Sequence, residues 1–215
     1  MQCLKLPEKS RDELLVNSNL VMQMFDEKGV SPYKTFESIS RFAHLLSACC
    51  GDNFAPRITR QRVTDNTEII LIEPACGSNT MIIQSTGDVI FVDSGYALYQ
   101  EEMVKIFREH LPNFDEMKKR ILVTHADVDH CGLLPLFDEI ITSVNTKRCL
   151  ELEFLGKDGY REQNPLHKPY VNMCKLMTGY QPVDPEKINA VWEVVEARVE
   201  PSVKSLVEPL QCRGV

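Results

Sequence analysis

Four residues whose side chains can bind a metal ion or move a proton lie within six positions near the middle of the sequence. They are His125, Asp127, Asp129 and His130. The first three alternate along the chain, so an extended segment would point their side chains the same way, and His130 could turn in from the other side. Imidazole and carboxylate groups are the usual protein ligands of divalent transition metals. We therefore expect the four side chains to face a common metal site.

The apolar residues before this cluster predict the element that positions it. Residues 121–123 are Ile-Leu-Val, and they lead directly into Thr124 and His125. A buried strand that ends in polar residues delivers side chains to the edge of a sheet, where binding and catalytic residues are common. The alternative is a polar loop whose aspartates cap the next helix. Four ligand-type side chains packed together are electrostatically costly without a cation or a proton, which favours the metal site.

The segments around the cluster read as strands and helices of a mixed sheet. Apolar runs predict strands over 57–64, 68–73, 79–84, 89–93 and 139–143, and Thr86-Gly87-Asp88 is a hairpin signal. Residues 99–110 have the apolar spacing of an amphipathic helix, with Met103, Ile106 and Phe107 on its inner face. Helical spacing also covers most of residues 8–50 and 165–179, whereas the charged residues 151–164 read as a surface loop and 192–199 as a strand.

Two motifs resemble those of a known family. Residues 124–132, Thr-His-Ala-Asp-Val-Asp-His-Cys-Gly, resemble the His-x-His-x-Asp-His motif of the metallo-β-lactamase superfamily. Residues 89–95, Val-Ile-Phe-Val-Asp-Ser-Gly, resemble the family's apolar strand that ends in Asp-Thr-Gly. The motifs occur in the family's order, with a helix-like segment between them. Asp127 departs from the family, which has its second histidine at that position.

The resemblance implies a fold and a set of roles. The fold is α+β, a metallo-β-lactamase-like αββα sandwich. His125, Asp127, Asp129 and His130 would be metal ligands, and Asp129 would also orient the attacking water as the catalytic residue. Asp93 would support the metal-bearing loop without binding metal itself. Cys131, beside the site, is expected to be a packed thiol.

The expected cofactor is a divalent metal ion that activates water for hydrolysis. Zinc is the first expectation from the resemblance. Asp127 makes the site harder and more anionic than one richer in imidazole, which shifts the preference toward iron or manganese.

The family's later ligands are not recognisable in this sequence. They include a Gly-His in a later strand, a bridging aspartate and a last histidine. After His130 the only histidine is His167, which lies in Pro-Leu-His-Lys-Pro without the Gly-His context. We therefore expect the C-terminal half of the fold to be incomplete, and the site to be completed by a second copy or another chain if it is completed at all.

Three functions remain open at this point. The first is a metal-dependent hydrolase acting on a small-molecule substrate that the sequence does not identify. The second is a non-catalytic or incomplete fragment of the same fold. The third is a diiron redox protein of the flavodiiron-like branch, which also has a carboxylate, a glutamate, at the position of Asp127.

Length and composition set the remaining expectations. The 215 residues, 43% of them hydrophobic, suit a helical N-terminal extension over 1–56 and one metallo-β-lactamase-like domain over 57–215. A net charge of −7 argues against a broad nucleic-acid surface. The first residues lack the apolar run of a signal peptide, and no stretch reaches the roughly 18 apolar residues that a membrane span needs. We therefore expect a cytoplasmic protein.

Overall fold

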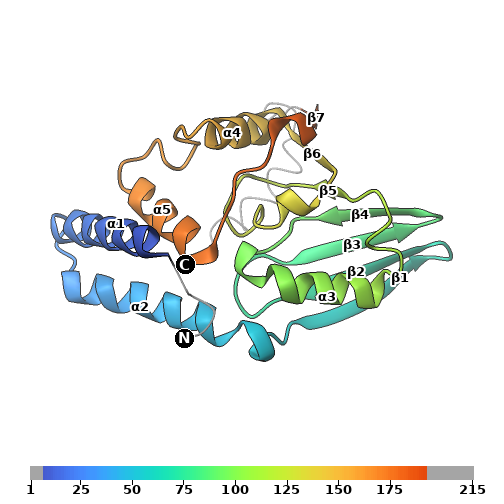
Figure 1. Ribbon diagram of the computed structural model, residues 1–215, viewed down its shortest axis with the longest axis horizontal. Coiled ribbons are helices and arrows are strands. Elements are labelled where there is room, and N and C mark those ends of the chain that lie inside the picture. Colours follow the sequence, from blue (N-terminus) through green and yellow to red (C-terminus); the bar gives the residue numbers. More distant parts are fainter. Residues whose placement is uncertain (1–6, 193–215) are drawn as a thin grey trace, which may run out of the picture.

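A seven-stranded mixed sheet runs through residues 7–192, which are the residues that the computed structural model describes (Figure 1). The strands lie in the sheet in their order along the sequence: β1 (Arg57–Thr64), β2 (Thr67–Glu73), β3 (Thr80–Ser85), β4 (Asp88–Val92), β5 (Arg120–Leu122), β6 (Glu139–Ser143) and β7 (Ile188–Trp192). The α-helices are α1 (Glu8–Asp26), α2 (Pro32–Ala48), α3 (Gln100–His110), α4 (Val144–Phe154) and α5 (His167–Thr178). The α+β class that the sequence predicted is confirmed.

The first four strands form an antiparallel meander. Each strand pairs with the next one along the chain, and Ile70 lies opposite Ile82, which lies opposite Phe91. All three side chains are fully buried on one face of the sheet. The turn between β3 and β4 places Gly87 at a φ of 88°, a left-handed conformation that glycine adopts without steric cost. The strands predicted over 57–64, 68–73, 79–84 and 89–93, and the hairpin turn predicted at residues 86–88, are confirmed.

The remaining strands run parallel to β4. Strand β5 lies between β4 and β6, and Ile121 is opposite both Phe91 and Ile140. The buried strand predicted directly before the polar cluster and the strand predicted over 139–143 are confirmed, although β5 ends at Leu122 and does not reach Thr124. Val123 continues the pairing with one hydrogen bond from its N–H to the carbonyl of Ile141, and the chain then leaves the sheet.

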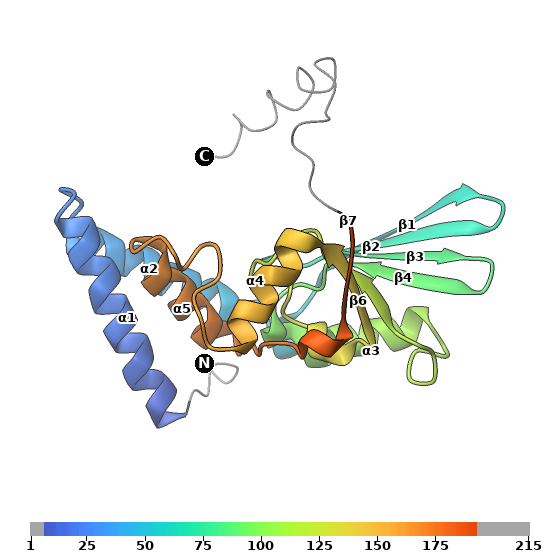
Figure 2. The same cartoon turned by 90° about the horizontal axis from the view of Figure 1, so that it is seen from above.

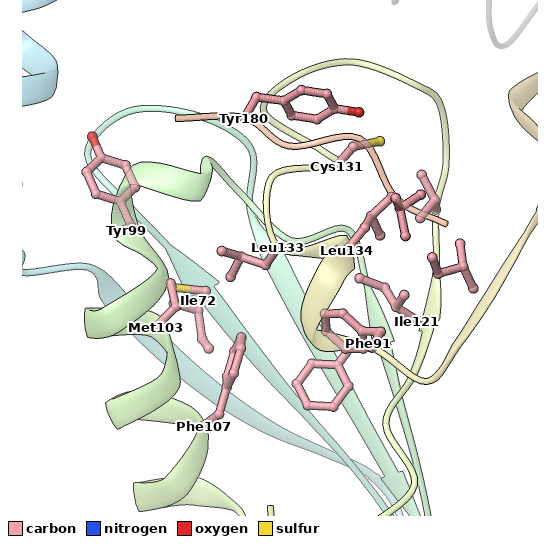
Figure 3. Packing of buried hydrophobic residues seen from close by; sticks show 14 of the residues in the cluster. Ile72, Phe91, Tyr99, Met103, Phe107, Ile121, Cys131, Leu133, Leu134 and Tyr180 are labelled. Atoms are coloured by element: carbon pink, nitrogen blue, oxygen red, sulfur yellow. The ribbon is translucent and has the colours of Figure 1, made fainter. Parts of the chain in front are cut away.

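Helix α3 covers one face of the meander and builds the core with it. Its Met103, Ile106 and Phe107 are buried, as the helical spacing predicted. Phe107 packs against Phe91 with 5.0 Å between the ring centroids and an interplanar angle of 71°, the edge-to-face geometry that aromatic pairs favour. Figure 3 shows Phe91 of β4 facing Phe107 of α3 inside this cluster.

The N-terminal helices pack together with α5 beside the sheet (Figure 2). Val21 of α1 is buried, and Leu46 near the end of α2 is fully buried within the same hydrophobic core as the sheet residues. Helix α5 ends at Thr178, and the next residue, Gly179, has a φ of 70°, the left-handed conformation that commonly follows a helix. The helices expected within 8–50 and 165–179 are confirmed. In the described part of the chain, none of the helices combines the length and the apolar character that a membrane crossing requires.

Two expectations for the later part of the chain differ from the structure. Residues 151–164 do not form a simple surface loop, because α4 extends to Phe154 and Glu162 is buried. The charged residues of this segment suggested a solvent-exposed loop. The structure instead buries two of them, because Lys175 forms ion pairs with Glu153 and Glu162. The strand expected at 192–199 begins earlier, as β7 at Ile188, and the residues after Trp192 lie outside the described part.

Candidate metal site

The loop that follows β5 is fastened to the turn that follows β4. Ser94 donates from both its N–H and its Oγ to the carbonyl of His130, each at 3.0 Å. The N–H of Gly132 donates to the carbonyl of Gly95 at 3.0 Å. The backbones approach so closely that a Cβ added to Gly132 would lie 2.2 Å from the nitrogen of Ala97. The two sequence motifs are therefore one structural unit.

Asp93 is the centre of this unit. Its Oδ1 accepts a hydrogen bond from the N–H of Thr124 at 2.9 Å, and its Oδ2 accepts from Thr124 Oγ1 at 2.8 Å and from His130 Nδ1 at 2.8 Å. Burial alone would raise the pKa of the Asp93 carboxyl, but the hydrogen bonds from His130 and Thr124 lower it below its ordinary value. The prediction that Asp93 lies at the loop and accepts its hydrogen bonds is confirmed.

His130 is oriented by the same carboxylate. Since Asp93 is ionised and can only accept, Nδ1 of His130 carries the proton, which directs its other ring nitrogen away from Asp93. Burial lowers the pKa of His130, but Asp93 and Asp129 outweigh this and raise it. His130 Nε2 lies 3.7 Å from Asp129 Oδ2. Ser78 fixes the Asp129 backbone by donating its Oγ to the Asp129 carbonyl at 2.6 Å.

The other two candidate ligands form a separate pair. His125 Nε2 lies 3.1 Å from Asp127 Oδ2, and the same oxygen lies 2.6 Å from Nη2 of Arg161. The Asp127 side chain is only 15% exposed, whereas the Arg161 side chain is about half exposed. The rings of His125 and His130 are near each other, with centroids 4.0 Å apart. The four candidate side chains thus lie in one loop as two pairs, Asp129 with His130 and His125 with Asp127.

No three His, Cys, Asp or Glu side chains within residues 7–192 are arranged so that they could hold one metal ion together. His167 begins α5 and does not line the cavity at the loop. Cys131 is buried, and its thiol donates to the carbonyl of His125, so the expectation of a packed thiol is confirmed. Burial raises the pKa of this thiol well above its ordinary value. Metal binding by His125, Asp127, Asp129 and His130 stays a prediction.

A cavity of about 280 Å³ opens beside the loop. One wall is formed by the loop itself and by the turn after β4, with Tyr96, Ala126, Asp127, Val128, Asp129 and His130. The other wall comes from α4, α5 and the segment between them, with Glu153, Arg161, Glu162, Tyr170, Val171 and Cys174. Behind this wall, Lys175 bridges Glu153 and Glu162, and Tyr180 donates its hydroxyl to Glu153 at 2.6 Å.

Sequence reasoning missed Arg161 and the two buried glutamates. All three come from the region between the middle of α4 and the start of α5 that the charge pattern assigned to the surface. A single arginine in a charged segment carries no spacing signal. Only the fold brings it to Asp127.

Comparisons with known proteins agree with the two motifs. The family model described as the metallo-beta-lactamase superfamily matches residues 74–207. No curated protein is significantly similar to the chain in sequence.

Solved structures give distant matches. A flavoprotein from Thermotoga maritima is 23% identical with a TM-score of 0.38, and the match covers 49% of this chain and 31% of that one. MEM-A1, a subclass B3 metallo-beta-lactamase isolated from a soil metagenome library, is 18% identical with a TM-score of 0.41, covering 61% of this chain and 45% of that one. The matched part therefore spans about a third of the flavoprotein's length.

Proposed function

Because the chain belongs to the metallo-beta-lactamase superfamily, we propose that it is a metal-dependent hydrolase whose site is built on Asp129 and His130. The observation that carries the proposal is the chain of contacts from Asp93 through His130 to Asp129. A histidine whose Nδ1 is held by a carboxylate presents Nε2 as a ligand, and this arrangement is typical of histidines that bind metals. The nearby Asp129 carboxylate is a second suitable donor.

Imidazole and carboxylate are donor types that suit a divalent metal ion, and His130 and Asp129 would contribute one of each. Zinc is the first candidate, and iron or manganese are the alternatives because of the high carboxylate content. A metal ion bound there would lower the pKa of a water molecule toward about 7 and polarise a carbonyl or phosphoryl oxygen. Asp93 would keep the proton on His130 Nδ1, so the ring stays oriented. Asp129 would orient the attacking water through its second oxygen and accept its proton.

The substrate is proposed to be a small molecule that enters the cavity beside the loop. The cavity volume of about 280 Å³ is at the lower end of the range for small-molecule sites. Its acidic lining and the net charge of −7 do not favour a nucleic acid. A second copy or another chain that supplies further ligands is also part of the proposal, since two donors alone hold a metal weakly.

A non-catalytic role is the second candidate, and one observation favours it. Within the described residues, no group of three ligand-type side chains could hold one metal ion. A chain that retains the loop but binds no metal would act through its cavity as a binding module.

The decisive experiment measures metal content and hydrolysis in the same samples. Protein stripped with a chelator is reloaded with zinc, manganese or ferrous iron and tested on chromogenic esters, thioesters and phosphodiesters. We expect activity that depends on added metal and falls by about 100-fold or more in Asp129→Asn, the range for loss of a general base. Asp88→Asn, which alters an exposed carboxylate of β4, is the control and should retain activity. Absence of both metal binding and metal-dependent activity would favour the binding module.

A further inference from the structure

We infer that Arg161 supplies, at the His125–Asp127 pair, the positive charge that a second metal ion would supply, and thereby restricts the chain to one metal ion at Asp129 and His130. This inference rests on the proposed function, because it concerns how many metal ions the same loop accepts. It makes Arg161 a residue that determines metal stoichiometry.

The contact geometry leaves little room for a metal ion at this pair. Asp127 Oδ2 lies 2.6 Å from Arg161 Nη2 and 3.1 Å from His125 Nε2, so one oxygen faces both groups. A metal ion bound through Asp127 Oδ2 and His125 Nε2 would compete with the contacts that these two atoms already make. It would also lie a few ångströms from a guanidinium that keeps its positive charge at every ordinary pH, and like charges at that distance repel.

The fold delivers Arg161 to this position. The next residue, Glu162, is buried, and its carboxylate is held by Lys175 of α5, which also binds Glu153 of α4. The segment between α4 and α5 is thus tied down immediately beside Arg161. The Arg161 side chain is itself 52% exposed. Its pairing with Asp127 can therefore be removed without disturbing the buried charges behind it.

The pairing with Arg161 also accounts for the aspartate at position 127, where the family motif has a histidine. A neutral imidazole at this position would offer a guanidinium no charge to pair with, whereas the Asp127 carboxylate does. The charges of Asp127 and Arg161 therefore neutralise each other without a metal ion.

The other pair has no such cation. In the described part of the chain, the Asp129 carboxylate forms its ion-pair contact with His130 and has none with lysine or arginine. Its side chain is 31% exposed and lines the cavity, so solvent ions reach it. The asymmetry between the pairs predicts one metal position rather than two.

The test compares metal stoichiometry in the full chain and its variants. Wild type, Arg161→Gln and Arg161→Lys are equilibrated with manganese or zinc, and bound metal per chain is measured by equilibrium dialysis with elemental analysis. Thermal melts are recorded with and without the metal. We expect Arg161→Gln to bind one more ion per chain than wild type and to gain a larger rise in melting temperature on metal addition. Arg161→Lys keeps the charge and should resemble wild type.

Two further variants separate the inference from a simple loss of structure. Asp127→His removes the carboxylate that holds Arg161 beside His125 and adds an imidazole ligand. The half-exposed guanidinium is then free to turn toward solvent, so this variant should also gain an ion. Arg161→Gln combined with Asp127→Asn removes the carboxylate and should lose the gain. Lys168→Gln, which breaks an exposed ion pair with Asp158, controls for a general change in charge and should bind as wild type does.

The outcomes distinguish this inference from the proposed function. Equal stoichiometry in wild type, Arg161→Gln and Asp127→His would overturn the inference, whatever number of ions wild type binds. Wild type without bound metal or metal-dependent activity would overturn the proposed hydrolase instead. An extra ion that persists in the double variant would overturn the assignment of that ion to Asp127.

Discussion

At the scale of single residues, Asp93 has two structural tasks. It adopts a left-handed backbone conformation with φ of 52°, which is uncommon for a residue with a side chain. That conformation turns the chain at the end of β4 and directs the carboxylate toward Thr124 and His130. Strain of this kind persists where surrounding contacts fix it, and at Asp93 those contacts orient the loop.

Replacing Asp93 should therefore loosen metal binding without removing a ligand. We expect Asp93→Ala to weaken metal affinity by about 10–100-fold, the range found when the partner of a metal-binding histidine is lost. Asp93→Asn should weaken metal affinity too. Both carboxylate oxygens of Asp93 accept hydrogen bonds, whereas an amide has only one accepting oxygen, so the contact with Thr124 or the contact with His130 would be lost. Isothermal titration with zinc checks this, with Asp88→Ala on the same strand as the control. Unchanged affinity in Asp93→Ala would contradict the supporting role.

Gly132 gives a second prediction at this scale. An added Cβ would lie 2.2–2.6 Å from backbone atoms of residues 95–97, which cannot move without separating the two motifs. Gly132→Ala should destabilise the protein by about 3 kcal/mol, the upper part of the usual range for overpacking. Gly87→Ala is the matched control, because its added Cβ meets no atom and only the positive φ is penalised, by roughly 1 kcal/mol. Urea unfolding of both variants measures the difference, and equal losses would contradict the close approach.

Residues of the site that belong to a sequence motif were predictable, and residues placed there only by tertiary packing were not. Asp93 and His130 could be paired in advance because two motifs and a parallel strand pair place them together. The contact of Arg161 with Asp127 could not be predicted, because it depends on how α4 and α5 pack. The buried ion pairs in this region involve lysine and glutamate, which in a sequence suggest an exposed surface.

At the scale of elements, the end of α3 is tied to the edge strand β1. Arg60 of β1 donates from Nη2 to Nδ1 of His110 at 2.7 Å, and Nε2 of His110 is buried without a hydrogen-bond partner. Burial and then Arg60 lower the pKa of His110, and Glu109 and Glu68 oppose this only in part. A charged histidine would complement the dipole at this end of the helix, but the lowered pKa favours the neutral ring.

The stability of this contact should depend on pH with a definite sign. A histidine with a folded-state pKa below its ordinary 6.5 resists protonation, so folding is penalised as pH falls below 6.5 through the lowered value. The unfolding free energy of wild type minus that of His110→Gln should therefore be smaller at about pH 5 than at about pH 7.5. In Arg60→Gln the dependence should be weaker but still present, because burial remains. A difference that is the same at both pH values would refute this account.

Elements with a strong periodic pattern were the predictable ones. The strands of the meander alternate between the α3 face and the opposite face, and Met103, Ile106 and Phe107 follow helical spacing, so local sequence determines them. The segment 151–164 has no such period.

At the scale of the molecule, the N-terminal helices share the core of the sheet. Leu46 of α2 belongs to the same buried cluster as Ile72, Phe91 and Phe107. The division expected at residue 56 marks a change of sequence pattern, whereas the buried cluster continues across it.

Leu46→Ala tests whether they unfold together. Truncating this fully buried side chain should lower the free energy of unfolding by about 2–5 kcal/mol, and the whole unfolding transition should shift. Circular dichroism and tyrosine fluorescence should give coincident curves, as in a cooperative two-state transition. Leu45→Ala, one residue earlier and 44% exposed, should change stability by less than about 0.5 kcal/mol. Two separated transitions in Leu46→Ala would show that the helices unfold on their own.

The order of strands in the sheet, β1 to β7 as in the sequence, has a consequence for how the chain reaches this state. Within the meander β1 to β4, each strand pairs with the strand just before it through a short connection, whereas the parallel pairs that follow close over longer segments. Such local pairing favours rapid folding and allows the hairpins to form while the chain is still being synthesised. The loop with Asp127 would then exist before Arg161 has emerged. The ion pair between them cannot form until Arg161 has emerged, which leaves an interval in which the carboxylate meets solvent cations first.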